Sequence, residues 1–139
     1  MSDSTSFIDV VAGIIYNPSK TEVLLALRKP EQHQGNRWEF PGGKIEAAET
    51  TANALQRELQ EELGITTLAS NPYCQIEHRY ADKAVRLHFW QVTQFDGAPV
   101  GQENQALRWV PIKELAGVSF PEANQPVVER LLQSQQFIV

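Results

Sequence analysis

The sequence predicts an α/β fold in which a mixed β-sheet is combined with two helices. Segments rich in β-branched and apolar residues are interleaved along the chain with two segments of helical spacing. The chain has 139 residues, of which 42% are hydrophobic and 21% charged. That size and composition are typical of one ordinary globular domain with a sizeable core. We therefore expect a single domain over residues 1–139.

The first third of the chain predicts strands joined by turns. Residues 7–16 are rich in β-branched side chains and end at the turn Asn17-Pro18, which predicts a strand. Residues 22–27 (EVLLAL) predict a second strand, apolar enough to be buried on both faces. Residues 28–37 are polar and predict a loop. Residues 38–40 predict a short extended segment that ends at Pro41-Gly42-Gly43.

A helix is predicted from Thr50, which is a suitable N-cap residue, to about Leu63. Gly64 then stands in the C-terminal capping position. The spacing of the apolar residues places one stripe along this helix, which suits packing on a sheet. The stripe consists of Ala52, Leu55, Leu59 and Leu63.

The rest of the chain predicts a hairpin, a strand and a last helix. Residues 73–80 and 84–95 have strand composition on either side of Ala81-Asp82-Lys83, which predicts a hairpin. Residues 107–110 predict another strand. Residues 121–133 predict the last helix, with Pro126 in its first turns, where proline is best tolerated.

Three carboxylates occupy one face of the first helix, beside the apolar stripe. Glu58, Glu61 and Glu62 stand at i, i+3 and i+4, and a helix turns by roughly 100° per residue. Like charges at this spacing destabilise an isolated helix, so the pattern predicts a compensating cation. Oxygen ligands without Cys or His favour Mg²⁺ or Mn²⁺ over zinc.

The charge balance argues against a polynucleotide-binding protein. Seventeen acidic and twelve basic residues give a net charge of −5, whereas nucleic-acid binding usually requires a basic face. A nucleotide could bind only where metal ions and local Lys or Arg side chains reverse the sign. The single cysteine, Cys74, fits a reducing compartment. No secretory signal or membrane span is evident, so we expect a cytoplasmic protein without membrane contact.

One stretch of the sequence resembles a known family. Residues 43–65 (GKIEAAETTANALQRELQEELGI) fill every specified position of the pattern G-x5-E-x7-R-E-U-x-E-E-x-G-U, where U is apolar. The matching residues are Gly43, Glu49, Arg57, Glu58, Leu59, Glu61, Glu62, Gly64 and Ile65. This pattern is the Nudix box. The segments RWEFPGGKIE and FPEANQPVVERL resemble the MutT-type branch, and the likeness runs from about residue 7 to residue 132.

The resemblance implies a fold and an activity. Nudix hydrolases form an α/β/α sandwich around a central mixed sheet and cleave nucleoside diphosphates linked to a further group. They use Mg²⁺ or Mn²⁺ as cofactor. The MutT type hydrolyses nucleoside triphosphates, chiefly 8-oxo-dGTP, to the monophosphate and pyrophosphate, and so limits mutation during DNA replication. The expected partner of this chain is therefore a small nucleoside triphosphate, and we expect a monomer.

The resemblance also implies roles for residues of the box and its surroundings. Glu58 is the expected general base. The expected supporting residues are Arg57, which would pair with Glu49, and Lys44, which would reach a phosphate. Expected metal ligands are Glu58, Glu61, Glu62, Glu103 and a backbone carbonyl of Gly42 or Gly43.

Substrate binding is expected to depend on Asn124, which the resemblance places in the base pocket. An Asn amide offers an acceptor and donors side by side. Guanine shows two acceptors on its Hoogsteen edge, and oxidation at C8 converts N7 into a donor, which matches the amide. Further expected nucleotide contacts are Arg28, His33, the backbone of Glu39, Phe40, Pro41 and Gly42, and Lys83. At position 83 MutT-like proteins tend to have arginine, so a bidentate contact would be weakened here.

Two other functions are compatible with parts of the sequence. The segment GQENQALRWV also resembles the pyrimidine-directed Nudix branch, which acts on CTP or modified dCTP. A non-catalytic Nudix sensor or interaction module is the other alternative. Such modules typically lack the box carboxylates and carry an attached DNA-binding domain, whereas this chain keeps the carboxylates.

Overall fold

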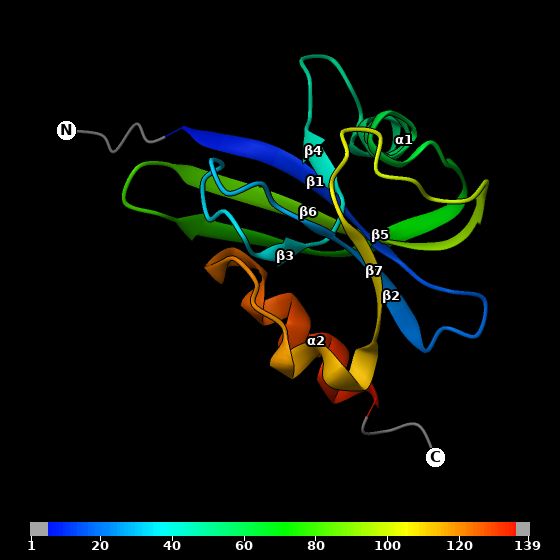
Figure 1. The fold of residues 1–139 in the computed structure, drawn as a ribbon. Helices are drawn as coiled ribbons and strands as arrows, with labels where there is room; N and C mark the ends of the chain where they lie inside the picture. Colours follow the sequence, from blue (N-terminus) through cyan, green and yellow to red (C-terminus); the bar gives the residue numbers. More distant parts are fainter. Residues whose placement is uncertain (1–5, 136–139) are drawn as a thin grey trace.

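The computed structural model describes residues 6–135 and arranges seven strands of that range in two sheets (Figure 1). The strands are β1 (Phe7–Ile15), β2 (Glu22–Leu27), β3 (Trp38–Glu39), β4 (Gly42–Lys44), β5 (Thr66–Arg79), β6 (Ala84–Asp96) and β7 (Leu107–Pro111). The helices are α1 (Thr51–Leu63) and α2 (Gln125–Gln135), with the 3-10 turns η1 (Ile112–Gly117) and η2 (Glu122–Asn124).

The larger sheet is mixed, as the sequence predicts. Its strand order is β4-β1-β6-β5, in which β1 runs parallel to β6 and the other pairs are antiparallel. Strands β3, β2 and β7 form a second, antiparallel sheet. An isolated bridge links Tyr16, the residue after β1 in the larger sheet, to Val23 of β2 in the second sheet.

Helices α1 and α2 cover opposite faces of the larger sheet (Figure 1). Successive residues of β1 point to opposite sides of the sheet, so this strand contributes side chains to the core under each helix. On one side Val11 and Ile15 belong to a core with Leu55, Leu59 and Leu63 of α1, all of them fully buried. Ala52, at the start of the predicted stripe, is partly buried. On the other side Ala12, Ile14 and Tyr16 belong to a core that includes Val127, Val128 and Leu131 of α2.

The predicted caps of α1 are present. The Thr50 hydroxyl accepts a hydrogen bond from the Asn53 N–H at 3.1 Å. Gly64 has a left-handed φ of 70°, and its N–H donates to the Gln60 carbonyl at 3.0 Å. These caps fix where the helix ends, and therefore where its carboxylate face lies relative to the sheet.

Three boundaries differ from the sequence prediction. Strand β5 begins at Thr66 rather than at residue 73, because residues 66–72 pair with β6 despite a polar composition and several register shifts. Gly42 and Gly43 do not end the extended segment but form β4, which pairs with β1. The last helix is divided, since η2 precedes α2.

No helix within residues 6–135 is long and apolar enough to cross a membrane.

Candidate active site

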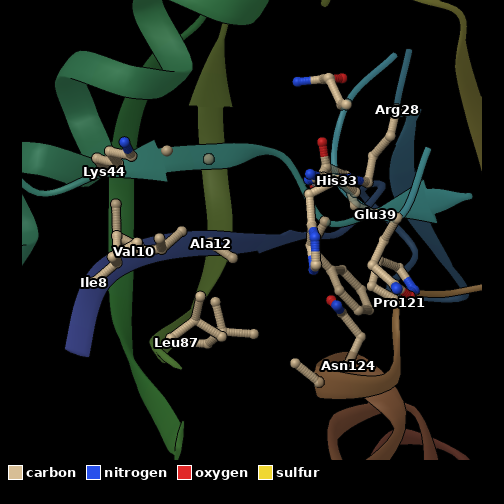
Figure 2. A pocket seen from close by; sticks show the side chains of 18 of the residues that line it. Ile8, Val10, Ala12, Arg28, His33, Glu39, Lys44, Leu87, Pro121 and Asn124 are labelled. Atoms are coloured by element: carbon tan, nitrogen blue, oxygen red, sulfur yellow. Dashed lines mark hydrogen bonds and ion pairs between the residues drawn. The ribbon is translucent and has the colours of Figure 1, made fainter. Parts of the chain in front are cut away.

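A cavity of about 290 Å³ opens between β1, β4, the loop after β2, the β5–β6 turn and η2. Its apolar wall includes Val10 and Ala12 of β1 and Leu87 of β6 (Figure 2). The size and mixed lining are those of a small-molecule site. Among the residues predicted for the active site, the cavity is lined by Arg28, His33, Glu39, Phe40, Gly42, Gly43, Lys44, Glu62, Lys83 and Asn124.

Pro41 is the one predicted substrate-binding residue that does not line this cavity. Its carbonyl accepts a hydrogen bond from the Gly13 N–H at 2.8 Å, which ties the segment before β4 to β1. Phe40 beside it is buried, and its ring lies against Phe89 and Phe120. The segment 39–42 is therefore held firmly, and its other residues line the cavity.

Asn124 is buried, with 7% of its surface exposed, and reaches the cavity from η2. Figure 2 shows its side-chain amide directed into the cavity, opposite β4. Its backbone N–H donates to the Pro121 carbonyl at 3.0 Å. Within residues 6–135 its side-chain amide forms no hydrogen bond. Because this unpaired amide is directed into the cavity, it is suited to bind a polar edge of a ligand.

Arg28, His33 and Glu39 form a polar group at one end of the cavity (Figure 2). The Arg28 guanidinium donates to the His33 carbonyl at 2.9 Å and forms an ion pair with Glu39. Burial raises the pKa of Glu39, and the neighbouring Arg28 opposes that shift. His33 Nδ1 lies 3.2 Å from the carboxylate of Asp82 in the β5–β6 turn.

Arg57 connects the loop after β4 to α1. The predicted pair with Glu49 is present and bidentate, with N–O distances of 2.7 and 2.9 Å. Arg57 also donates to the Lys44 carbonyl at 3.0 Å and to the Glu58 carboxylate at 2.9 Å. The hydrogen bond from Arg57 lowers the pKa of Glu49 to about 2. Glu49 therefore stays ionised at neutral pH.

Glu58 lies against Gly43, where any side chain would obstruct it. A Cβ atom on Gly43 would stand 2.3 Å from the Glu58 Oε2 atom. Burial raises the pKa of Glu58, while Arg57 opposes that effect. Glu58 itself does not line the cavity, but it lies directly beside Gly43, which does. This contact brings the helix face and the glycine strand together.

Glu62 is the carboxylate of α1 that lines the cavity. Burial raises its pKa to about 8, and repulsion from four neighbouring carboxylates adds to the effect. These are, in decreasing order of effect, Glu58, Glu39, Glu103 and Glu61. The Gln102 N–H and the Gln105 side chain both donate to the Glu62 carbonyl, at 3.0 and 3.3 Å. These bonds fasten the loop that carries Glu103 to the end of α1.

The carboxylates fit a hard divalent cation in chemistry. Within residues 6–135, no three His, Cys, Asp or Glu side chains are close enough to form a preassembled metal centre. The oxygen donors at this edge are nevertheless carboxylates and the carbonyl groups of β4, with no nitrogen or sulfur ligand. A cation there would also offset the repulsion that raises the pKa of Glu62.

Tyr80 is a cavity residue that sequence reasoning missed. It follows β5 directly and precedes the turn, so the pattern identified it only as the end of a strand. Its hydroxyl accepts a hydrogen bond from the Ala123 N–H at 3.0 Å. No spacing rule indicates a contact between residues 43 positions apart.

The NUDIX domain family matches residues 11–130, which is most of the chain. The chain belongs to the Nudix family. This Nudix domain is 39% identical over 124 residues to an 8-oxo-dGTP diphosphatase of Escherichia coli, a match that covers 89% of this chain and 95% of the relative. It is 36% identical over 125 residues to a CTP pyrophosphohydrolase of the same species, covering 90% and 91%.

Solved structures give the same result for the fold. A MutT structure from work on the Aliivibrio salmonicida and Vibrio cholerae proteins superimposes on this Nudix domain with a TM-score of 0.82. The two are 40% identical, and the match covers 93% of this chain and 99% of the other. The predicted Nudix-type α/β/α architecture is therefore confirmed.

Proposed function

We propose that this Nudix domain is a metal-dependent pyrophosphohydrolase that converts oxidised guanine nucleoside triphosphates, chiefly 8-oxo-dGTP, to the monophosphate and pyrophosphate. The observation that carries the proposal is the side-chain amide of Asn124, which faces a cavity of about 290 Å³ without a hydrogen-bond partner of its own in the described residues. The same cavity is lined by Glu62 of α1 and by Gly43, and the Glu58 carboxylate of α1 lies beside Gly43.

The amide supports an oxidised over an ordinary guanine by hydrogen-bond matching. Asn124 offers one acceptor and two donors. Ordinary guanine presents acceptors at both O6 and N7, so one of its groups would face the amide oxygen unfavourably. Oxidised guanine carries a hydrogen on N7 and pairs with both ends of the amide. Val10, Ala12 and Leu87 give the ring an apolar surface to pack on.

The triphosphate would extend toward α1 and β4, which carry the carboxylates and the lysine that would bind metal and phosphate. Glu58, Glu61, Glu62 and Glu103, with a carbonyl of Gly42 or Gly43, would hold Mg²⁺ or Mn²⁺. When bound, such an ion supplies positive charge that neutralises the phosphate oxygens. Lys44 lines the cavity from β4 and would add positive charge near the leaving pyrophosphate. Glu58 would accept the proton of the attacking water.

Arg57 and Glu49 would act by holding this geometry. Their bidentate pair fastens residues 44–49 to the helix. Because Arg57 also donates to Glu58, it fixes the carboxylate that serves as base. Arg28, His33 and Lys83 would contact the sugar and phosphate from the loop and the hairpin turn.

A pyrimidine substrate is the second candidate. A CTP pyrophosphohydrolase is almost as similar to this chain as the 8-oxo-dGTP diphosphatase is. Cytosine presents an amino donor and a ring nitrogen acceptor, which an Asn amide could also meet. The cavity is lined by apolar side chains along β1 and β6, which suits the larger purine ring.

A screen of nucleoside triphosphates with product analysis tests the proposal. Canonical and oxidised triphosphates are assayed with Mg²⁺, and both the rate and the release of intact pyrophosphate are recorded. We expect the highest kcat/KM for 8-oxo-dGTP, with pyrophosphate as a product. A large advantage for CTP would overturn the purine proposal, and release of inorganic phosphate alone would overturn the reaction class.

A further inference from the structure

Tyr80 lies where three cavity-lining segments meet. Its ring meets the ring of His33, from the loop after β2, edge-on at 4.5 Å between centroids. Tyr80 itself begins the β5–β6 turn, and its hydroxyl accepts a hydrogen bond from the Ala123 N–H of η2 at 3.0 Å. One side chain therefore contacts both the loop after β2 and the η2 turn, which both line the cavity.

The bond to Ala123 bears directly on Asn124, the next residue. N–H groups in the first turn of a helix have no partner within the helix. At η2 the Tyr80 hydroxyl supplies that partner for Ala123. The Asn124 side chain has no hydrogen bond of its own within residues 6–135. The place of its amide is therefore set by the η2 backbone, which Tyr80 holds.

A second contact joins the same two elements. His78, near the end of β5, has its Nε2 atom 3.3 Å from the Glu122 carboxylate in η2. The His78 ring also packs against the Tyr80 ring, with centroids 4.6 Å apart. The end of β5 thus contacts η2 at two successive residues, Glu122 and Ala123, and the contact with Ala123 is a hydrogen bond.

We infer that Tyr80 is a positioning residue for base selection, which holds η2 so that the Asn124 amide stands at the distance the base requires. The inference rests on the proposed function, in which that amide distinguishes oxidised from ordinary guanine. Tyr80 need not touch the base itself. Its loss should alter the choice between bases more than the rate of hydrolysis.

The variant Tyr80→Phe tests this role, because it keeps the ring contacts and removes only the hydroxyl. We expect the ratio of kcat/KM for 8-oxo-dGTP to that for dGTP to fall about five-fold, the factor of one ordinary hydrogen bond. The kcat for dGTP should change little. Tyr16→Phe is the matched control, since its hydroxyl accepts a hydrogen bond from Gln91 at 2.8 Å and lies outside the cavity lining. That variant should keep the wild-type ratio.

The outcomes separate this inference from the function on which it rests. A wild-type ratio close to one would remove the oxidised-base proposal together with the role of Tyr80. A high wild-type ratio that Asn124→Ala abolishes and Tyr80→Phe preserves would overturn the role of Tyr80 alone. A melting temperature for each variant shows whether a changed ratio reflects loss of the fold.

Hydrogen exchange gives a second test that requires no variant. In the wild-type protein the Ala123 amide should exchange slowly, because its hydrogen is bonded to the half-buried Tyr80. The amide of the neighbouring residue in η2, Glu122, whose residue surface is exposed, serves as the internal reference. Exchange of Ala123 at the rate of an unprotected amide would show that the bond does not hold η2, and would overturn the inference even if Tyr80→Phe failed to fold.

Discussion

At the residue scale, the carboxylates around α1 differ in their environments and therefore in their suitability for chemistry. Glu49 is held ionised by Arg57, and its pKa is lowered to about 2. Glu58 and Glu62 are more buried, and burial is the largest cause that raises the pKa of each. A group whose pKa is raised toward neutrality is a better proton acceptor at the pH of the reaction. This contrast favours Glu58 over Glu49 as the base.

We predict that Glu58→Gln lowers kcat by roughly 100-fold or more, the usual contribution of a general base. The amide keeps the size of the side chain, and the fold should be retained. The measurement is steady-state hydrolysis of 8-oxo-dGTP with circular dichroism as a check of folding. The control is Glu129→Gln, an exposed position on α2, which should leave kcat unchanged. Turnover of Glu58→Gln at the wild-type rate would assign the base elsewhere.

Asn124→Ala should weaken the preference for oxidised guanine. Loss of the matched pair is expected to cost about 1–3 kcal/mol for 8-oxo-dGTP relative to dGTP. Competitive inhibition by 8-oxo-dGMP and dGMP measures the difference without requiring turnover. The neighbouring amide Gln125 is exposed, and Gln125→Ala is the control that should preserve discrimination. Equal discrimination by both variants would exclude Asn124 from the base pocket.

At the element scale, the short strand β4 depends on a close approach that only glycine permits. A Cβ atom on Gly42 would stand 1.9 Å from the Val11 carbonyl oxygen, within the backbone of β1. Side-chain adjustment cannot relieve a contact with backbone, so β4 would have to move away from β1. The next residue of the strand is Gly43, and Glu58 packs against it. A displaced β4 would therefore disturb the site as well as the sheet.

Gly42→Ala should lower the free energy of unfolding by about 1–3 kcal/mol, the usual cost of inserting a methyl group where none fits. Urea denaturation measures this change. Gly117→Ala is the matched control, because a Cβ atom at Gly117 meets nothing within 4 Å. Its effect should stay within about 0.5 kcal/mol of wild type. Equal stability of the two variants would show that β4 does not lie as close to β1 as the Gly42–Val11 distance implies.

The elements that the sequence predicted well are those fixed by local interactions. The α1 boundaries follow from Thr50 and Gly64, which act on their own helix. The early part of β5 was missed because its strand form comes from pairing with β6, and the polar run with Pro72 carries no alternation. The site divides in the same way. Glu49, Arg57 and the carboxylates of α1 lie in one recognisable stretch, whereas the contact of Tyr80 with Ala123 exists only after folding.

At the scale of the whole molecule, the site concentrates negative charge in a chain that is already acidic. Glu62 favours its protonated form in the folded state, because burial and the neighbouring carboxylates raise its pKa from the ordinary range to about 8. Relative to a carboxyl group with an unshifted pKa, this group therefore costs stability at neutral pH, where the unfolded chain loses the proton that the folded chain retains. That cost begins above the unfolded pKa and is fully present above the folded one. A bound divalent cation would remove it.

We predict a melting temperature a few degrees higher in millimolar Mg²⁺ than in EDTA at equal ionic strength, because a ligand that binds only the folded state stabilises it by mass action. In EDTA, Glu62→Gln should melt above wild type, since the neutral amide is not repelled by its neighbours. The variant should also lose most of the Mg²⁺ effect. Equal melting temperatures of the wild type in both buffers would count against a cation site in the folded chain.

The parallel ladder between β1 and β6 has a consequence for synthesis on the ribosome. Phe7 pairs with Ala84 and Ile15 pairs with Val92, so each partner is made 77 residues later. At translation rates of about 5–20 residues per second, β6 is synthesised roughly 4–15 s after β1. During that time β4, with three residues, is the only strand of the larger sheet available to pair with β1. An unfinished chain thus exposes an open strand edge. Until β6 has left the exit tunnel, that edge of β1 stays open to pairing with other chains.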